Sequence, residues 1–135
     1  MSYPIETVEG IAKKFGAKLR KAGIARTDHL LDRAATRKGR KTVSEETGIE
    51  EKLILKWTNC CDLMRVKGIG EEYSELLEAA GVDTVKELRK RKPGNLHTAM
   101  LEANTKKKLV RQPPGIKQVE KWVSHAKELP AVMKY

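Results

Sequence analysis

The stretch of sequence with the clearest chemical potential is Val66-Lys67-Gly68-Ile69-Gly70. Two glycines flank one apolar residue, and an amphipathic run follows, so the pattern predicts a tight hairpin that leads into a helix. Because glycine tolerates backbone angles that other residues resist, the amides of the turn and the first N–H groups of the helix could point outward together. Such a set of donors suits a phosphate oxygen. Ile69 would plug inward and hold the turn in place.

The same pattern occurs a second time near the start of the chain. At one constant offset the two copies align in register, with Ala12 of the first copy at the position of Gly70. The aligned pairs are Gly10 and Gly68, Ile11 and Ile69, Phe15 and Tyr73, Leu19 and Leu77, Gly23 and Gly81, and Leu30 and Leu88. An internal duplication explains this set far better than coincidence.

Each copy also contains a second Gly-Ile pair, at Gly48 in the first copy and at Gly115 in the second. Each pair introduces a longer helical pattern that carries a tryptophan flanked by aliphatic residues. We interpret Trp57 and Trp122 as core anchors, with base stacking as the alternative.

The composition favours helices over strands. Hydrophobic residues make up 39% of the chain but aromatic residues only 4%, so aliphatic side chains must build the core. No stretch alternates in the manner of a half-buried strand, and no Asn-Gly or Asp-Gly hairpin occurs. We expect an all-α fold of roughly eight helices, in two pseudo-repeated bundles packed as one compact body. The expected units are residues 1–64 and 65–135, with a basic insertion near 105–114.

The net charge of +10 points to an acidic partner. Nucleic acid is the first candidate for this partner, and an anionic membrane surface is the second. A soluble protein with a lysine-rich solvated surface is the alternative, and net charge alone does not distinguish it from a binding protein. No apolar run approaches the roughly 18 residues that a transmembrane helix needs, and the N-terminus does not read as a signal peptide. The only cysteines, Cys60 and Cys61, match no zinc or redox spacing. We therefore expect a soluble cytoplasmic protein with no membrane partner.

Two basic clusters occupy equivalent places in the two copies. They are Arg37, Lys38, Arg40 and Lys41 in the first, and Arg89, Lys90, Arg91 and Lys92 in the second. We expect them in loops between short helices, near 27–34 and 43–47 in the first copy and before 96–103 in the second. They could present two phosphate-binding patches, and solvated loops are the alternative. The run 106–113 reads as a third basic loop.

The helices that follow the two hairpins carry opposite charges. Lys13, Lys14 and Arg20 follow the first hairpin, whereas Glu71, Glu72 and Glu78 hold the aligned positions after the second. Carboxylates at a helix N-terminus are favoured by the helix dipole, but they would repel a phosphate. Glu71, Glu75 and Glu78 share one helical face by their spacing. This face could meet Lys13, Lys14 and Arg20 of another molecule in a head-to-tail contact.

Catalysis finds little support in the sequence. His29, His97 and His125 are scattered without metal-ligand spacing. No nucleophile triad, phosphate-binding loop or paired-carboxylate motif is visible. We expect no enzymatic activity, no cofactor and no metal.

These patterns resemble the tandem helix-hairpin-helix family. The match to the hairpin motif of that family is full at residues 66–70 and partial at residues 8–12, and the turns at Gly48 and Gly115 look like degenerate second hairpins. The arrangement is also similar to N-terminal domains of archaeal recombinases. Over almost its whole length the chain resembles an uncharacterised bacterial family, a domain of unknown function built from two such units.

The resemblance implies a function as well as a fold. It implies binding to the phosphodiester backbone without sequence preference, through hairpin amides that would position a duplex but not read its bases. When the motif of the family is aligned with this chain, the expected phosphate-contacting residues are Lys67, Gly68, Ile69 and Gly70, and in the first copy Gly10 and Ile11. We expect a non-enzymatic module that binds nucleic acid, with DNA as the first candidate. The alternative is a protein-interaction or self-assembly module that kept the fold without phosphate binding.

Overall fold

The expected all-α fold is confirmed. The structure is a computed structural model that describes residues 2–135, and this part of the chain contains eight α-helices and no strand. The elements are a 3-10 helix η1 (Ile5–Thr7), followed by α1 (Lys13–Lys21), α2 (Thr27–Ala34), α3 (Arg37–Thr47), α4 (Glu51–Leu63), α5 (Glu71–Ala79), α6 (Val85–Leu88), α7 (Pro93–Lys107) and α8 (Ile116–Glu128). None of the helices described combines the length and apolar character needed to cross a membrane.

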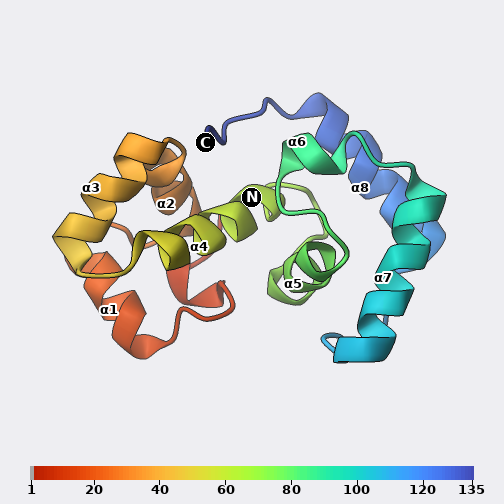
Figure 1. Ribbon diagram of the computed structural model, residues 1–135, viewed down its shortest axis with the longest axis horizontal. Coiled ribbons are helices and arrows are strands. Elements are labelled where there is room, and N and C mark those ends of the chain that lie inside the picture. Colours follow the sequence, from red (N-terminus) through yellow and green to blue (C-terminus); the bar gives the residue numbers. More distant parts are fainter. Residues whose placement is uncertain (1) are drawn as a thin grey trace.

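The helices form two groups that lie side by side (Figure 1). In the first group α2 packs against both α3 and α4, and in the second α7 packs against α5 and α8. Helix α4 ends between the groups and contacts α5 directly. The hairpin at 66–70 follows α4 after a short turn, so no flexible linker separates the two groups.

Each group has its own hydrophobic core, as expected where amphipathic helices bury their apolar faces against one another. The first core is built around Trp57 and the second around Trp122. Successive residues at the end of α4 belong to different cores, because Leu63 lies in the second and Met64 in the first. The two cores therefore meet at this helix end.

The segment after α8 returns to the first group (Figure 1). Met133 is part of the first core, and Val132 packs against that core. The backbone N–H of Lys134 donates to the carbonyl oxygen of Ala35 at 2.8 Å. The hydroxyl group of Tyr135 donates to the side-chain oxygen of Asn59 at 3.0 Å. The end of the chain thus ties the second group to the first.

A buried carboxylate joins the elements at the junction. Asp62, in the last turn of α4, is 1% exposed and accepts a hydrogen bond of 2.8 Å from the backbone N–H of Val85, the first residue of α6. Arg65 forms an ion pair with Asp62 at 2.9 Å and also donates to the carbonyl oxygen of Pro130 at 2.6 Å. These contacts fix the end of α4, the start of α6 and the returning segment relative to one another.

The residues that the sequence alignment pairs have closely similar geometry in the two groups. Gly10 and Gly68 have φ angles of +93° and +94°. Phe15 lies against Trp57 with ring centroids 5.2 Å apart and planes at 57°. The matching pair, Tyr73 and Trp122, has values of 5.1 Å and 56°. The two hairpins are therefore held against their tryptophans in the same way.

One of the expected basic loops is helical instead, and the third, expected at 106–113, begins two residues later than expected. Helix α3 begins at Arg37, because the side-chain oxygen of Thr36 accepts a hydrogen bond of 3.1 Å from the N–H of Gly39 and caps the helix. The first basic cluster thus forms the first turns of α3, and Gly39 is a helical residue. Helix α7 runs on to Lys107, so only residues 108–115 connect it to α8. The second cluster, residues 89–92, does lie in the turn between α6 and α7.

Candidate nucleic-acid interface

The backbone conformation of the second hairpin depends on one glycine, Gly68. Gly68 has a φ of +94°, in the left-handed region that residues with a Cβ rarely adopt. Ile69 is fully buried, and its N–H donates to the carbonyl oxygen of Val66 at 3.1 Å, so it plugs the turn into the second core as expected. Gly70 has a φ of −103°, and a Cβ added there would meet nothing within 4 Å. Gly70 therefore does not need to be glycine.

This result changes how the first hairpin compares with the second. Ala12, which replaces the second glycine, has an ordinary φ of −80°. The residue that needs conformational freedom is Gly10, and it is present. Ile11 is buried beneath the turn like its counterpart in the second hairpin. The backbone of the first hairpin is accordingly as well formed as that of the second.

Each hairpin lies against the indole of the last helix of its group. A Cβ added to Gly68 would be 3.0 Å from Nε1 of Trp122, and one added to Gly10 would be 3.0 Å from Nε1 of Trp57. Trp122 and Trp57 are only 1% and 2% exposed. The rings are buried in the cores, so their faces are not free to stack on a nucleic-acid base.

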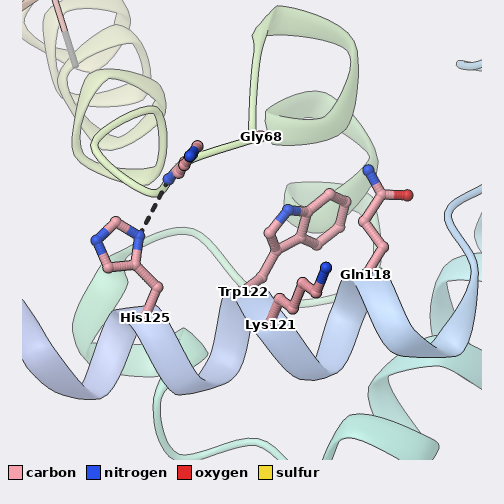
Figure 2. A pocket seen from close by; sticks show the side chains of 6 residues that line it. Gly68, Gln118, Lys121, Trp122 and His125 are labelled. Atoms are coloured by element: carbon pink, nitrogen blue, oxygen red, sulfur yellow. Dashed lines mark hydrogen bonds between the residues drawn. The ribbon is translucent and has the colours of Figure 1, made fainter.

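The second hairpin presents a set of unpaired backbone donors. Among the contacts of residues 2–135, no acceptor is found for the N–H groups of Gly68 and Gly70, nor for those of the first turn of α5. The N–H of Lys67 is used differently, because it donates to Nδ1 of His125 at 3.1 Å (Figure 2). The hairpin amides available to a phosphate are therefore those of Gly68 and Gly70, whereas Lys67 offers its side chain.

A depression of about 590 Å³ lies beside this hairpin and is bounded by one face of α8. Its lining residues are Lys67, Gly68, Gln118, Lys121, Trp122 and His125. Figure 2 shows the four side chains of α8 in a row that faces the hairpin. None of the lining residues is acidic, and most of the polar groups are donors: two ammonium groups, the indole N–H, the Gln118 amide and the Gly68 N–H. The electrostatics of this depression suit an anion.

The first hairpin offers similar donors without a row of this kind. The N–H groups of Gly10 and Ala12 have no acceptor in the part of the chain that the structure covers. Lys13 and Lys14 are exposed in the first turn of α1, which contains no acidic residue. An anion bound at the N-terminus of α1 would therefore lie close to the positive charges of these two lysines.

The acidic side chains of α5 lie outside the depression. Glu71 and Glu72 are exposed in the first turn of the helix, whereas Glu75 is half-buried at the contact with α4. Arg20 in the first group pairs with Glu6, its Nε at 2.8 Å from Oε2 and its Nη2 at 2.7 Å from Oε1. Of the six residues expected to form a head-to-tail contact, Arg20 is therefore paired within its own chain, and Glu75 is only partly accessible.

One predicted nucleic-acid contact lies inside the protein. Arg40 is 5% exposed, and its guanidinium group donates to the carbonyl oxygens of Ala34 at 3.0 Å, Ala35 at 3.2 Å and Lys134 at 3.0 Å. Burial lowers the pKa of Arg40 from its ordinary value. The expectation that Arg40 contacts phosphate is therefore corrected, because its donors satisfy backbone carbonyls.

The other members of the basic clusters remain at or near the surface. Arg37, Lys38 and Lys41 are exposed on α3, as are Lys90 and Lys92 in the turn before α7, while Arg89 and Arg91 are half-buried. The clusters lie in different groups of helices, and none of their residues lines the depression at Gly68.

Sequence reasoning missed the contribution of α8. Gln118, Lys121 and His125 recur at three- and four-residue intervals, the spacing of one helix face. That signal was present, but nothing in it showed that the face would lie against the hairpin.

The chain belongs to the family described as "Domain of unknown function (DUF4332)", whose model matches residues 9–129. No curated protein and no solved structure shows a significant match to the chain.

Proposed function

We propose that the protein is a non-enzymatic module that binds the phosphate backbone of nucleic acid, preferentially duplex DNA, through hairpins of the helix-hairpin-helix type. The observation that carries the proposal is the depression at Gly68, where unpaired amide, indole and ammonium donors converge without a carboxylate. A phosphate oxygen is an acceptor only, so it matches a set made of donors.

The same groups explain why binding would be independent of sequence. The donors near Gly68 and Gly10 are backbone amides and flexible lysines, which suit phosphates and do not distinguish one base edge from another. The tryptophans are buried and offer no stacking platform. Two hairpins on one body allow two contacts with the same backbone, and the net charge of +10 attracts it from a distance.

The alternative function, self-assembly through opposite charges, has less support. Lys13 and Lys14 could still meet Glu71 and Glu72 of a second molecule, but Arg20 is paired with Glu6 and Glu75 is half-buried. Light scattering at low salt separates the two proposals, because a head-to-tail contact forms chains or rings as concentration rises.

The test is an anisotropy titration with duplex and single-stranded DNA at several salt concentrations. The wild type should bind the duplex more tightly, with an affinity that falls steeply as salt rises. A variant with Lys67→Ala and Lys121→Ala should bind more weakly, with a salt slope reduced by about 2 if each lysine neutralises one phosphate. Lys117→Ala is the matched control, since Lys117 is exposed on α8 but does not line the depression. An equal loss in the control variant, or a flat salt dependence of the wild type, would refute the proposal.

A further inference from the structure

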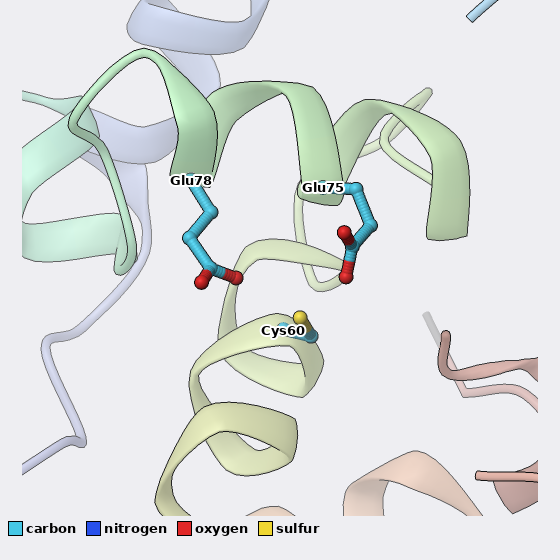
Figure 3. Close-up of side chains that lie close together, drawn as sticks. All are labelled: Cys60, Glu75 and Glu78. Atoms are coloured by element: carbon cyan, nitrogen blue, oxygen red, sulfur yellow. The ribbon is translucent and has the colours of Figure 1, made fainter. Parts of the chain in front are cut away.

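A second cluster of potential ligands lies where the two groups of helices meet. Cys60 is on α4, and Glu75 and Glu78 are on α5. One ligand atom of each residue lies within 4.8 Å of the other two (Figure 3). Because Glu75 and Glu78 are three residues apart on one helix, both carboxylates extend from α5 toward α4 and the Cys60 sulfur.

The cluster contains a polar atom whose bonding is incomplete. Oε1 of Glu75 is buried, and no hydrogen-bond partner for it is found among residues 2–135. None of the ion pairs in that part of the chain involves Glu75 or Glu78. A buried carboxylate oxygen without a partner is costly, so this atom requires a partner from outside the chain, either a water molecule or an ion.

The electrostatics of the cluster favour a cation. Burial raises the pKa of the Cys60 thiol to about 12, and the neighbouring Glu78 and Glu75 carboxylates add to the effect. Burial also raises the pKa of Glu75, an effect that Lys56 opposes. The thiol and the carboxylates therefore destabilise one another's charged forms, and a positive ion between them would reverse this.

We propose that Cys60, Glu75 and Glu78 bind a divalent metal ion of the zinc type. One sulfur and two oxygens form a mixed set that suits Zn²⁺ better than Mg²⁺ or Ca²⁺, which prefer oxygen alone. Bonds of about 2.0–2.3 Å to a shared ion are compatible with ligand atoms this close together. Three protein ligands leave the fourth tetrahedral position to water at the exposed Glu78 side of the cluster. On binding, the metal–sulfur bond forms and the thiol proton passes to solvent.

The position of the site indicates what the ion would do. It would link α4 to α5, which belong to different groups of helices and pack against each other. The hairpin depression has a separate lining, so this inference does not depend on nucleic-acid binding. The ion would act as a structural cross-link.

The experiment uses the tag-free full chain, with Co²⁺ as a spectroscopic probe and Zn²⁺ as its competitor. Wild-type protein should take up one equivalent of Co²⁺ with a thiolate-to-cobalt charge-transfer band, and Zn²⁺ should displace it and raise the melting temperature. Cys60→Ser should abolish the band, and Glu75→Gln should weaken binding while leaving the thiolate in place. Circular dichroism checks that each variant remains folded.

Two matched controls make the assignment specific. Cys61→Ser removes the neighbouring thiol, which is equally buried but outside the cluster, and Glu72→Gln removes an exposed carboxylate of the same helix. Both should bind metal as the wild type does. The proposal is overturned if wild-type protein shows no charge-transfer band, if Cys60→Ser binds as tightly as wild type, or if Cys61→Ser loses binding to the same extent.

Discussion

The carboxylate of Asp62 accepts a 2.8 Å hydrogen bond from the backbone N–H of Val85, in the buried region where the two groups of helices meet. Val85 is the first residue of α6, so Asp62 satisfies one of the N–H groups that every helix start leaves unpaired. The side-chain oxygen of Thr84 satisfies another, from Glu87. A four-residue helix would be marginal alone, and these contacts explain why it forms here.

Replacing Asp62 by alanine should lower the free energy of unfolding by about 2–4 kcal/mol. The substitution leaves the Val85 N–H and the Arg65 guanidinium without their carboxylate partner. Urea denaturation measures the loss. Asp32→Ala is the control, because Asp32 is exposed, and it should change stability by no more than about 0.5 kcal/mol. Equal midpoints for the two variants would show that Asp62 does not hold the junction.

The two glycines of the second hairpin should respond differently to alanine. Gly68→Ala should cost about 1–3 kcal/mol, because it forces a residue with a Cβ to a φ of +94° and places that Cβ 3.0 Å from Nε1 of Trp122. Gly70→Ala meets no neighbour and should be neutral or stabilise by up to about 1 kcal/mol. Thermal unfolding of both variants checks the prediction, and a larger loss for Gly70→Ala would contradict it.

Substitutions of Arg40 and Lys41 should have different effects, the first on stability and the second on nucleic-acid binding. Arg40→Lys keeps the charge but cannot donate to three carbonyl oxygens in the same geometry, so it should destabilise the fold by about 1.5–3 kcal/mol. Lys41→Ala removes an exposed charge and should leave stability nearly unchanged while weakening DNA binding slightly. Denaturation curves and salt titrations of the same preparations measure both properties. A stable Arg40→Lys variant would mean that the buried contacts are dispensable.

The ion pair between Glu6 and Arg20 should make stability depend on pH in the acid range. The Arg20 guanidinium lowers the pKa of Glu6 from 4.5 to about 2, so the folded state favours the charged carboxylate. Its contribution is complete above the unfolded pKa and is lost as the pH falls from 4.5 through about 2. The stability difference between wild type and Glu6→Gln should therefore shrink over this range.

A glycine beneath the pair offers a second probe. A Cβ added to Gly16 would lie 2.5 Å from Oε2 of Glu6, so Gly16→Ala should displace the carboxylate and give the same pH dependence as Glu6→Gln. Glu72→Gln, which removes a carboxylate without an ion pair in residues 2–135, is the control because it leaves the Glu6–Arg20 pair in place. A Glu6→Gln curve parallel to that of wild type would contradict the assignment.

Local sequence patterns predicted the parts of the fold that depend on local geometry. The turns at Gly10 and Gly68, the buried Ile11 and Ile69, and the buried tryptophans follow from glycine's conformational range and from helical periodicity. The start of α3 was not predicted, because Gly39 within a basic run suggested a loop. In the structure the side chain of Thr36 caps the helix, so the helix begins at Arg37.

Contacts between distant segments could not be read from the sequence. Arg40 is buried because residue 134 returns to it from the other end of the chain, and no feature of the basic cluster indicates this. The same holds for Cys60, whose neighbours Glu75 and Glu78 lie on the next helix. In both cases contacts between separate segments decide which side chain faces a partner.

The return of the C-terminal segment also bears on how the protein is made. During translation the first group of helices leaves the ribosome early, but Val132 and Met133, which complete its core, emerge only after all eight helices. Until then the Nη2 donor of Arg40 lacks its acceptor, the carbonyl oxygen of Lys134. The first group of helices can therefore fold early, as N-terminal units generally do, but it gains these last contacts only after α8 has been made.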